Sequence, residues 1–208
     1  MIPASLKGAA WAALFFSALA ALGQPAKPAA KPSVAQRAEV CFACHGAKGQ
    51  SQLPLTPSLG AQPSFFVVAQ LFLFRDGRRG NALPAMTEVA KTLTDDDLRA
   101  FAELISKLPP PVPPGKPTDA QKYARGREVV LTQNCTTCHN PDLSGREQMP
   151  RLANQREDYL LKALRDYKSG ARLGYGGAMA EELSPLKDAD LVDIAQFLAY
   201  LPAKPPAK

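Results

Sequence analysis

The pattern that decides the fold of this chain occurs twice, as Cys41-Phe42-Ala43-Cys44-His45 and as Cys135-Thr136-Thr137-Cys138-His139. Together the two copies use all four cysteines and both histidines of the 208 residues. Cysteines in an exported chain suggest disulfides, and a CxxC pair can also be a redox dithiol or half of a zinc site. A tetra-cysteine zinc site leaves both histidines unexplained, and a thioredoxin-like motif requires alternating strands and helices. The pattern therefore favours two covalent haem c groups, each bonded to a cysteine pair and bound at its iron by the adjacent imidazole.

The two halves of the chain also repeat one another outside these motifs. Cys41 precedes Cys135 by 94 positions, and after a one-residue deletion the offset stays at 93. The pairs matched at this offset are Pro57 and Pro150, Leu59 and Leu152, Gln62 and Gln155, Leu71 and Leu164, Gly77 and Gly170, Arg79 and Arg172, Met86 and Met179, and Leu98 and Leu191. Chance does not hold so many residue types in register, so the sequence indicates a duplicated domain.

Composition divides the chain into five segments. Lys7, a short apolar run and small residues predict a signal peptide over 1–23, with an uncleaved membrane anchor as the alternative. Residues 24–33, of Pro, Ala and Lys, predict a flexible tether. Six prolines among residues 109–118 predict an extended linker. The linker separates an N-terminal domain (34–108, first haem) from a C-terminal domain (119–203, second haem).

Each domain is predicted to be all-α. Amphipathic stretches precede both cysteine motifs, at 34–40 and 123–131. Middle helices are expected over 64–75 and 157–168, ended by Gly77 and Gly170. Thr94, followed by three aspartates, predicts an N-cap, and the apolar spacing from Leu98 predicts the last helix of the first half. No strand pattern competes with these helices.

Methionines supply the candidates for the second axial ligand of each iron, since no third histidine exists. Met86 and Met179 are repeat partners, 41 and 40 residues after His45 and His139. Met149 has no counterpart and is expected to be an apolar packing residue. Ligation by histidine and methionine saturates the iron and raises its potential, which favours electron transfer over catalysis.

Two tandem domains with the order CxxCH, Pro-x-Leu-x-x-Gln, Gly-x-Arg and Met resemble the class I cytochromes c of the bacterial cytochrome c-four (cytochrome c4) family, over about residues 34–203. The resemblance implies that Pro57 and Pro150 accept hydrogen bonds from the proximal imidazoles. It also implies domains related by a pseudo-twofold axis, and periplasmic electron shuttling, often to a terminal oxidase. Arg79 and Arg172, seven residues before the methionines, are expected to meet haem propionates. Asn140, in place of the glycine at Gly46, departs from the pattern.

The sequence is compatible with three functions. The first is a free shuttle between a membrane complex and an oxidase in a respiratory chain. The second is a permanent electron-accepting subunit of a periplasmic dehydrogenase, and the third is a dihaem peroxidase, which two matched methionines disfavour. The net charge of +6 is spread over both halves. Because the chain is predicted to be exported, this charge favours docking to a redox protein or peripherally to an anionic membrane, and not to nucleic acid.

Overall fold

The computed structural model describes residues 32–79, 84–172 and 177–202. The predicted signal peptide and nearly all of the predicted tether lie outside this range. Within it the secondary structure is helical apart from an isolated bridge between Arg146 and Met149, so the all-α prediction is confirmed. No helix in the described ranges has the length and apolar character needed to cross a membrane.

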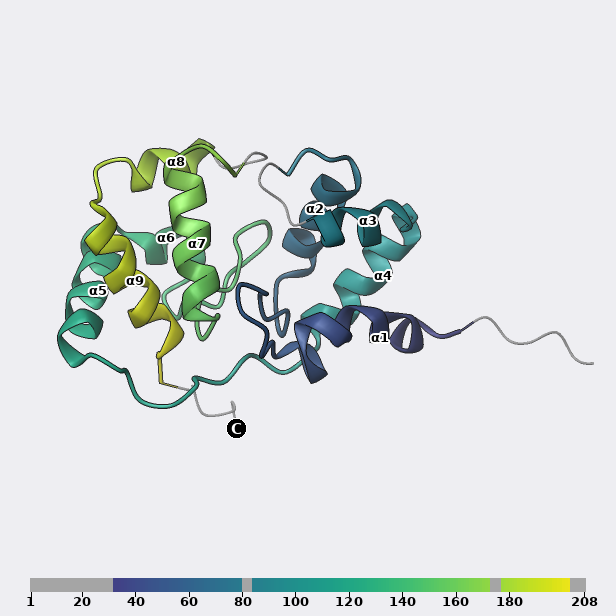
Figure 1. Cartoon of the computed structure of the whole chain (residues 1–208), viewed down its shortest axis with the longest axis horizontal. Helices are drawn as coiled ribbons and strands as arrows, with labels where there is room; N and C mark the ends of the chain where they lie inside the picture. The colour runs from purple at the N-terminus through teal and green to yellow at the C-terminus, as the bar shows by residue number, and fades with distance from the viewer. Residues whose placement is uncertain (1–31, 80–83, 173–176, 203–208) are drawn as a thin grey trace, which may run out of the picture. The chain divides into compact units, whose positions relative to one another are not determined.

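The longer helices of the described chain have 12 or 13 residues, and the shorter ones have three to eight. In the first half they are α1 (Val34–His45), the 3-10 turn η1 (Ala47–Gly49), α2 (Ser64–Arg75), α3 (Pro84–Lys91) and α4 (Asp95–Ser106). In the second half they are α5 (Ala120–Thr132), α6 (Cys135–His139), α7 (Glu157–Lys168), α8 (Gly177–Leu183) and α9 (Asp188–Ala199). Figure 1 shows the first set in purple to teal and the second in teal to yellow.

The middle helices agree with the sequence prediction. α2 and α7 begin and end at the expected residues. Gly77 and Gly170 follow them with φ of 64° and 73°, the left-handed conformation in which a chain leaves a helix and which glycine adopts without steric cost. At α4, the Thr94 hydroxyl accepts from the Asp97 amide and the Asp97 carboxylate accepts from the Thr94 amide, which completes a capping box.

The helices that precede the cysteine motifs differ between the halves. α1 continues through the motif to His45, whereas α5 stops at Thr132 and the chain turns at Asn134, whose φ is 52°. Both helices are longer than the periodicity indicated. α1 begins at the expected residue, after the N-cap Ser33, and gains its length by continuing through the motif, whereas α5 begins three residues earlier than expected because Asp119 caps it. The short helices α3 and α8 were not predicted, since seven or eight residues carry too little apolar periodicity.

The first half packs around α4. α4 contacts both α2 and α1, and Val67, Ala102 and Ile105 form the buried cluster between α2 and α4. Arg37 of α1 pairs with Asp97, and its guanidinium lies 5.1 Å from the centre of the Phe101 ring. This side chain therefore fastens the helix that carries the first cysteine motif to the core.

The second half packs more extensively, around α9. α5 and α7 both lie against α9, and α8 contacts α7. Eight of the twelve residues of α9 are buried, against four of twelve in α4. Phe197 of α9 also packs against Tyr123 of α5, with ring centres 5.2 Å apart. The second half thus builds its core on one central helix.

Gly126 allows α5 to approach α9 closely. A Cβ placed on Gly126 would lie 2.0 Å from the Asp193 carbonyl oxygen and 2.9 Å from Phe197 Cβ. We expect Gly126→Ala to destabilise the protein by about 3 kcal/mol or more, because two packed backbones would have to separate. Chemical denaturation measures this, and Gly177→Ala in α8, where an added Cβ meets nothing within 4 Å, is the matched control. Equal stability of the two variants would contradict the tight crossing.

Candidate haem sites

The two cysteine motifs present their side chains in the same way. His45 and His139 are buried, with 6% and 4% of their surface exposed. The first cysteine of each motif, Cys41 or Cys135, is half-buried, and the second, Cys44 or Cys138, is exposed. Burial raises the pKa of the Cys41 and Cys135 thiols. Each motif therefore has its imidazole inside the domain and its thiols at the rim, the arrangement needed to bond the edge of a planar group and ligate its centre.

Each buried imidazole is held by a proline carbonyl. His45 Nδ1 lies 2.7 Å from the Pro57 oxygen, and His139 Nδ1 lies 2.9 Å from the Pro150 oxygen. A carbonyl only accepts, so Nδ1 carries the hydrogen and Nε2 has a free lone pair. Burial lowers the pKa of both histidines, although the proline carbonyl acts in the opposite direction. The rings are thus held by Nδ1 in an orientation that leaves Nε2 for a metal.

His139 Nε2 shows that the second site fits a metal. This nitrogen is buried and has no hydrogen-bond partner in the described structure. A buried polar atom without a partner is costly, and an iron bound at Nε2 satisfies it. The geometry of this histidine and the chemistry of the cysteine pair are those that a haem c group requires.

The methionines lie on the two short helices. Met86 is on α3 and Met179 is on α8, and both are half-buried. Met179 packs against the same core cluster as Cys135 and Leu152. Met149 is half-buried as well, but it is not among the residues that pack against the cluster around α9. It lies in the turn that its backbone closes with Arg146, beside Cys138.

The two matched arginines meet at the contact between the halves. Arg79 donates to the Tyr159 hydroxyl (3.1 Å) and Arg172 donates to Gln70 Oε1 (3.1 Å), so each guanidinium binds a side chain of the other half. Each also lies 4.4 Å from the centre of an aromatic ring in its own half, Phe74 or Tyr167. These rings are repeat partners as well, so the two arginines occupy equivalent places.

The arginines have a common electrostatic effect on Tyr159. Burial raises the pKa of Tyr159, but the charges of Arg172 and Arg79 outweigh burial and lower it to about 8. Burial lowers the pKa of Arg79, and the nearby charge of Arg172 lowers it further. Two guanidinium groups held together on neutral partners create an environment that favours an anion.

Two glutamines join the halves in a matched manner that the sequence did not assign. The Gln62 side chain binds the backbone of Arg151 at both its N–H and its C=O, with both distances 3.0 Å. Gln155 does the same to Ser58, with distances of 2.7 and 2.8 Å. The halves belong to one compact unit beginning at Pro32. The repeat had marked both glutamines as equivalent, and this was the only signal in the sequence.

Asn140 adopts the backbone conformation of the glycine that it replaces. Gly46 has φ 77° and ψ 157°, and Asn140 has φ 70° and ψ 155°. The side-chain amide of Asn140 offsets the steric cost of this positive φ by donating to Ser144 Oγ (3.0 Å) and to the Gly145 carbonyl (2.8 Å). At Gly46 no side chain fits, since a Cβ would lie 1.9 Å from the Gln50 oxygen. The departure at Asn140 therefore preserves the turn after the haem motif.

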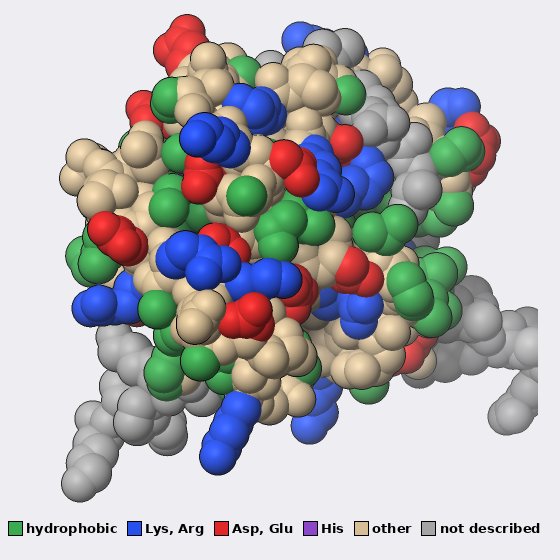
Figure 2. All heavy atoms as spheres, turned by 60° about the vertical axis from the view of Figure 1, so that its left-hand side comes forward, with side chains coloured by type: hydrophobic (Ala, Val, Ile, Leu, Met, Phe, Trp, Pro, Cys, Tyr) green, Lys and Arg blue, Asp and Glu red, His purple; other side chains and the backbone are tan. Residues whose placement is uncertain are grey.

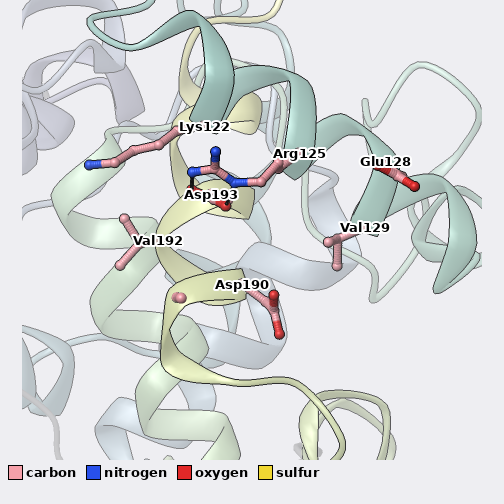
Figure 3. Close-up of a pocket in the computed structure, with 8 residues that line it drawn as sticks. Lys122, Arg125, Glu128, Val129, Asp190, Val192 and Asp193 are labelled. Carbon is pink, nitrogen blue, oxygen red and sulfur yellow. Dashed lines mark hydrogen bonds and ion pairs between the residues drawn. The ribbon is translucent and has the colours of Figure 1, made fainter.

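A surface pocket between α5 and α9 is separate from these sites. It is lined by Lys122, Arg125, Glu128, Val129, Ala189, Asp190, Val192 and Asp193. Figure 3 shows Arg125 and Asp193 facing each other, with Arg125 Nε 2.7 Å from the buried carboxylate. Its lining contains no cysteine, histidine or methionine, so it offers nothing to ligate iron.

Charges of both signs are mixed on the surface. On the face drawn in Figure 2, Lys and Arg side chains alternate with Asp and Glu, and hydrophobic side chains lie between them. This mixture agrees with the even distribution of charge in the sequence. It favours reversible docking over strong attachment to a polyanion.

Comparison with known proteins identifies the family. The family model described as Cytochrome c matches residues 123–202. The chain is 32% identical over 190 residues to the thiosulfate dehydrogenase electron acceptor of Thiomonas intermedia, covering 86% of this chain and 87% of that protein. It is 31% identical over 170 residues to cytochrome c4 of Thiocapsa roseopersicina, covering 78% and 87%.

A solved structure supports the same assignment. Reduced recombinant cytochrome c4 from Pseudomonas stutzeri matches with a TM-score of 0.70 and 26% identity, over 78% of this chain and 94% of that chain. Both helical halves and both cysteine motifs thus have a place in one known architecture, in which two cytochrome c domains follow one another. The chain therefore belongs to the cytochrome c4 family, and it is an electron carrier with two covalent haem c groups.

Proposed function

We propose that each half binds its haem with the same set of residues. Cys41 and Cys44, and equivalently Cys135 and Cys138, form the thioether bonds. His45 and His139 are the proximal ligands, oriented by Pro57 and Pro150, and Met86 and Met179 complete the coordination. The observation that carries this proposal is the pair of His–Pro hydrogen bonds of 2.7 and 2.9 Å, which leave Nε2 of each ring available.

Arg79 and Arg172 are the proposed partners of the haem propionates. Both guanidinium groups bind neutral side chains, and each is close enough to influence the pKa of Tyr159. Propionates placed here would neutralise the two charges and be held by charge-assisted hydrogen bonds. This would also bring the carboxylates of both haems towards the contact between the halves.

The bound haems supply a one-electron couple between Fe(III) and Fe(II). With His45 and Met86, or His139 and Met179, as its two axial ligands, each iron would have no free position for oxygen or peroxide, which favours electron transfer over catalysis. We propose that the protein works in the periplasm as a shuttle that delivers electrons towards a terminal oxidase. The predicted signal peptide over 1–23 and the mixed surface charge support this location and this mode of docking.

Purification of the exported protein tests this proposal. We expect mass spectrometry to find a mature chain that begins near residues 21–24 and carries two haem groups, with Met1 and Trp11 removed. The reduced protein should be reoxidised by membranes that contain a terminal oxidase, and an inhibitor of the oxidase should stop this. An intact Met1 would contradict export with cleavage, and reduced haem that stays reduced would contradict the oxidase as acceptor.

A second function is favoured by relatives that serve as electron acceptors. The thiosulfate dehydrogenase electron acceptor of Thiomonas intermedia aligns with 86% of this chain, which supports a role as the electron-accepting partner of a dehydrogenase. Affinity purification from the native cell distinguishes the two roles. A catalytic subunit in a one-to-one complex that reduces both haems on addition of its substrate would favour the acceptor subunit over the free shuttle.

A further inference from the structure

The contact between the halves has an internal symmetry centred on two glutamines. Gln155 Oε1 accepts from the Ser58 amide at 2.7 Å and its Nε2 donates to the Ser58 carbonyl at 2.8 Å. Gln62 makes the same pair of bonds to Arg151, at 3.0 Å each. Both glutamines are 4% exposed; the bonds between Gln155 and Ser58 are buried, and those between Gln62 and Arg151 are partly buried. In a dry environment a hydrogen bond polarises its partner more strongly than it does in solvent.

The amides that bind the glutamines belong to the same peptide groups as the carbonyls that bind the histidines. The amide of Ser58 and the carbonyl of Pro57 form one peptide unit, and that carbonyl lies 2.7 Å from His45 Nδ1. Likewise the amide of Arg151 and the carbonyl of Pro150 form one unit, 2.9 Å from His139 Nδ1. Each proximal histidine is therefore connected through a single peptide group to a glutamine of the other half.

A peptide group transmits polarisation because it is conjugated. When its N–H donates a hydrogen bond, its carbonyl oxygen becomes more negative and a better acceptor. A stronger bond from Nδ1–H to this oxygen gives the imidazole more anionic character and makes it a better donor to iron. A better donor stabilises Fe(III) relative to Fe(II) and lowers the reduction potential.

We propose that Gln62 and Gln155 are positioning residues that act across the domain contact, each tuning the proximal histidine of the other half. Gln155, in the second half, sets the strength of the His45–Pro57 bond of the first haem. Gln62, in the first half, sets the strength of the His139–Pro150 bond of the second haem. This inference rests on the proposed ligation by His45 and His139, and it gives the contact a role in electron transfer beyond cohesion.

The crossed connection makes a direct test possible. We expect Gln155→Leu to raise the potential of the first haem, by a change of roughly two- to tenfold in its Fe(III)/Fe(II) equilibrium, while the second haem stays near its wild-type value. Gln62→Leu should do the reverse. NMR of the reduced, diamagnetic protein gives a second readout, because the Nδ1–H resonance of His45 should move in Gln155→Leu and that of His139 in Gln62→Leu.

Two further variants separate tuning from simple cohesion. Gln155→Glu keeps an oxygen that accepts from the Ser58 amide, and a carboxylate is a stronger acceptor than an amide oxygen, so it should move the His45 resonance in the direction opposite to that of Gln155→Leu. Tyr159→Phe breaks the bond from Arg79 across the same contact but touches neither peptide group, so it should leave both Nδ1–H resonances in place. Should the leucine variant fold poorly, Gln155→Met, which is closer in size, is measured instead.

The outcomes distinguish this inference from the proposed ligation. If Gln155→Leu moved the potential and the resonance of the second haem, or moved both haems equally, the crossed tuning would be overturned. A protein that lacked covalent haem or methionine ligation in the wild type would instead overturn the proposed ligation itself. Retention of two normally ligated haems with no crossed shift would leave the glutamines as structural contacts only.

Discussion

Cys135→Ala should yield a protein with one covalent haem in place of two, and with a much less stable second half. Cys135 and Met179 both pack against the cluster of buried residues around α9, so the haem attached here completes that core. Its loss leaves a cavity comparable to the loss of a large core side chain, and we expect a cost of about 3–5 kcal/mol. Mass spectrometry counts the haems, and thermal unfolding measures the stability.

The repeat and the motif itself provide the controls for this variant. Cys41→Ala is the equivalent change in the first half and should remove the other haem. Thr137→Ala alters an exposed residue between the two cysteines of the second motif and should keep both haems. Two covalent haems in Cys135→Ala would mean that the motif does not attach the second group.

Met86→Ala and Met179→Ala should each remove about half of the weak charge-transfer band that thioether ligation gives ferric haem at the red end of its spectrum. Each variant should also lower the potential of one haem and open its iron to added ligands, because the soft sulfur that favours Fe(II) is gone. Weak peroxidase activity is expected to accompany the open position. Optical spectra of the oxidised protein and redox titration measure these effects.

Met149→Ala is the internal control for the axial ligands. Met149 has no repeat partner, lies in the turn closed with Arg146 and borders the small pocket beside Cys138, so its replacement should leave the band intact. Loss of the band in Met149→Ala, with its retention in Met179→Ala, would refute the ligand proposed for the second haem. The three substitutions remove the same side chain from three settings, which isolates the effect of position.

The parts of the fold that sequence predicts well are those with local causes. The bounds of α2 and α7 follow from apolar periodicity and from the glycines after them, and the start of α4 follows from Thr94 and its aspartates. The same holds for the haem motifs, where the chemistry depends on adjacent residues. Local rules also explain why the family resemblance was visible in the residues alone.

The parts that sequence did not predict depend on contacts between distant residues. Nothing near Gln155 indicates that its amide binds the backbone of Ser58, 97 positions away. The close approach of α5 to α9 at Gly126 likewise brings together residues 67 or more positions apart in the sequence. The repeat identified the matched residues but could not say that the arginines and glutamines of each half bind the other half.

The paired glutamine contacts have the form of an isologous interface, in which the same patch serves both sides, yet both sides belong to one chain. Such a contact between two separate single-haem proteins would depend on their concentration. Here the ten residues 109–118 hold the second patch near the first, which corresponds to an effective concentration of the order of millimolar. A small set of hydrogen bonds between the halves therefore acts at this effective concentration, whatever the concentration of the protein itself.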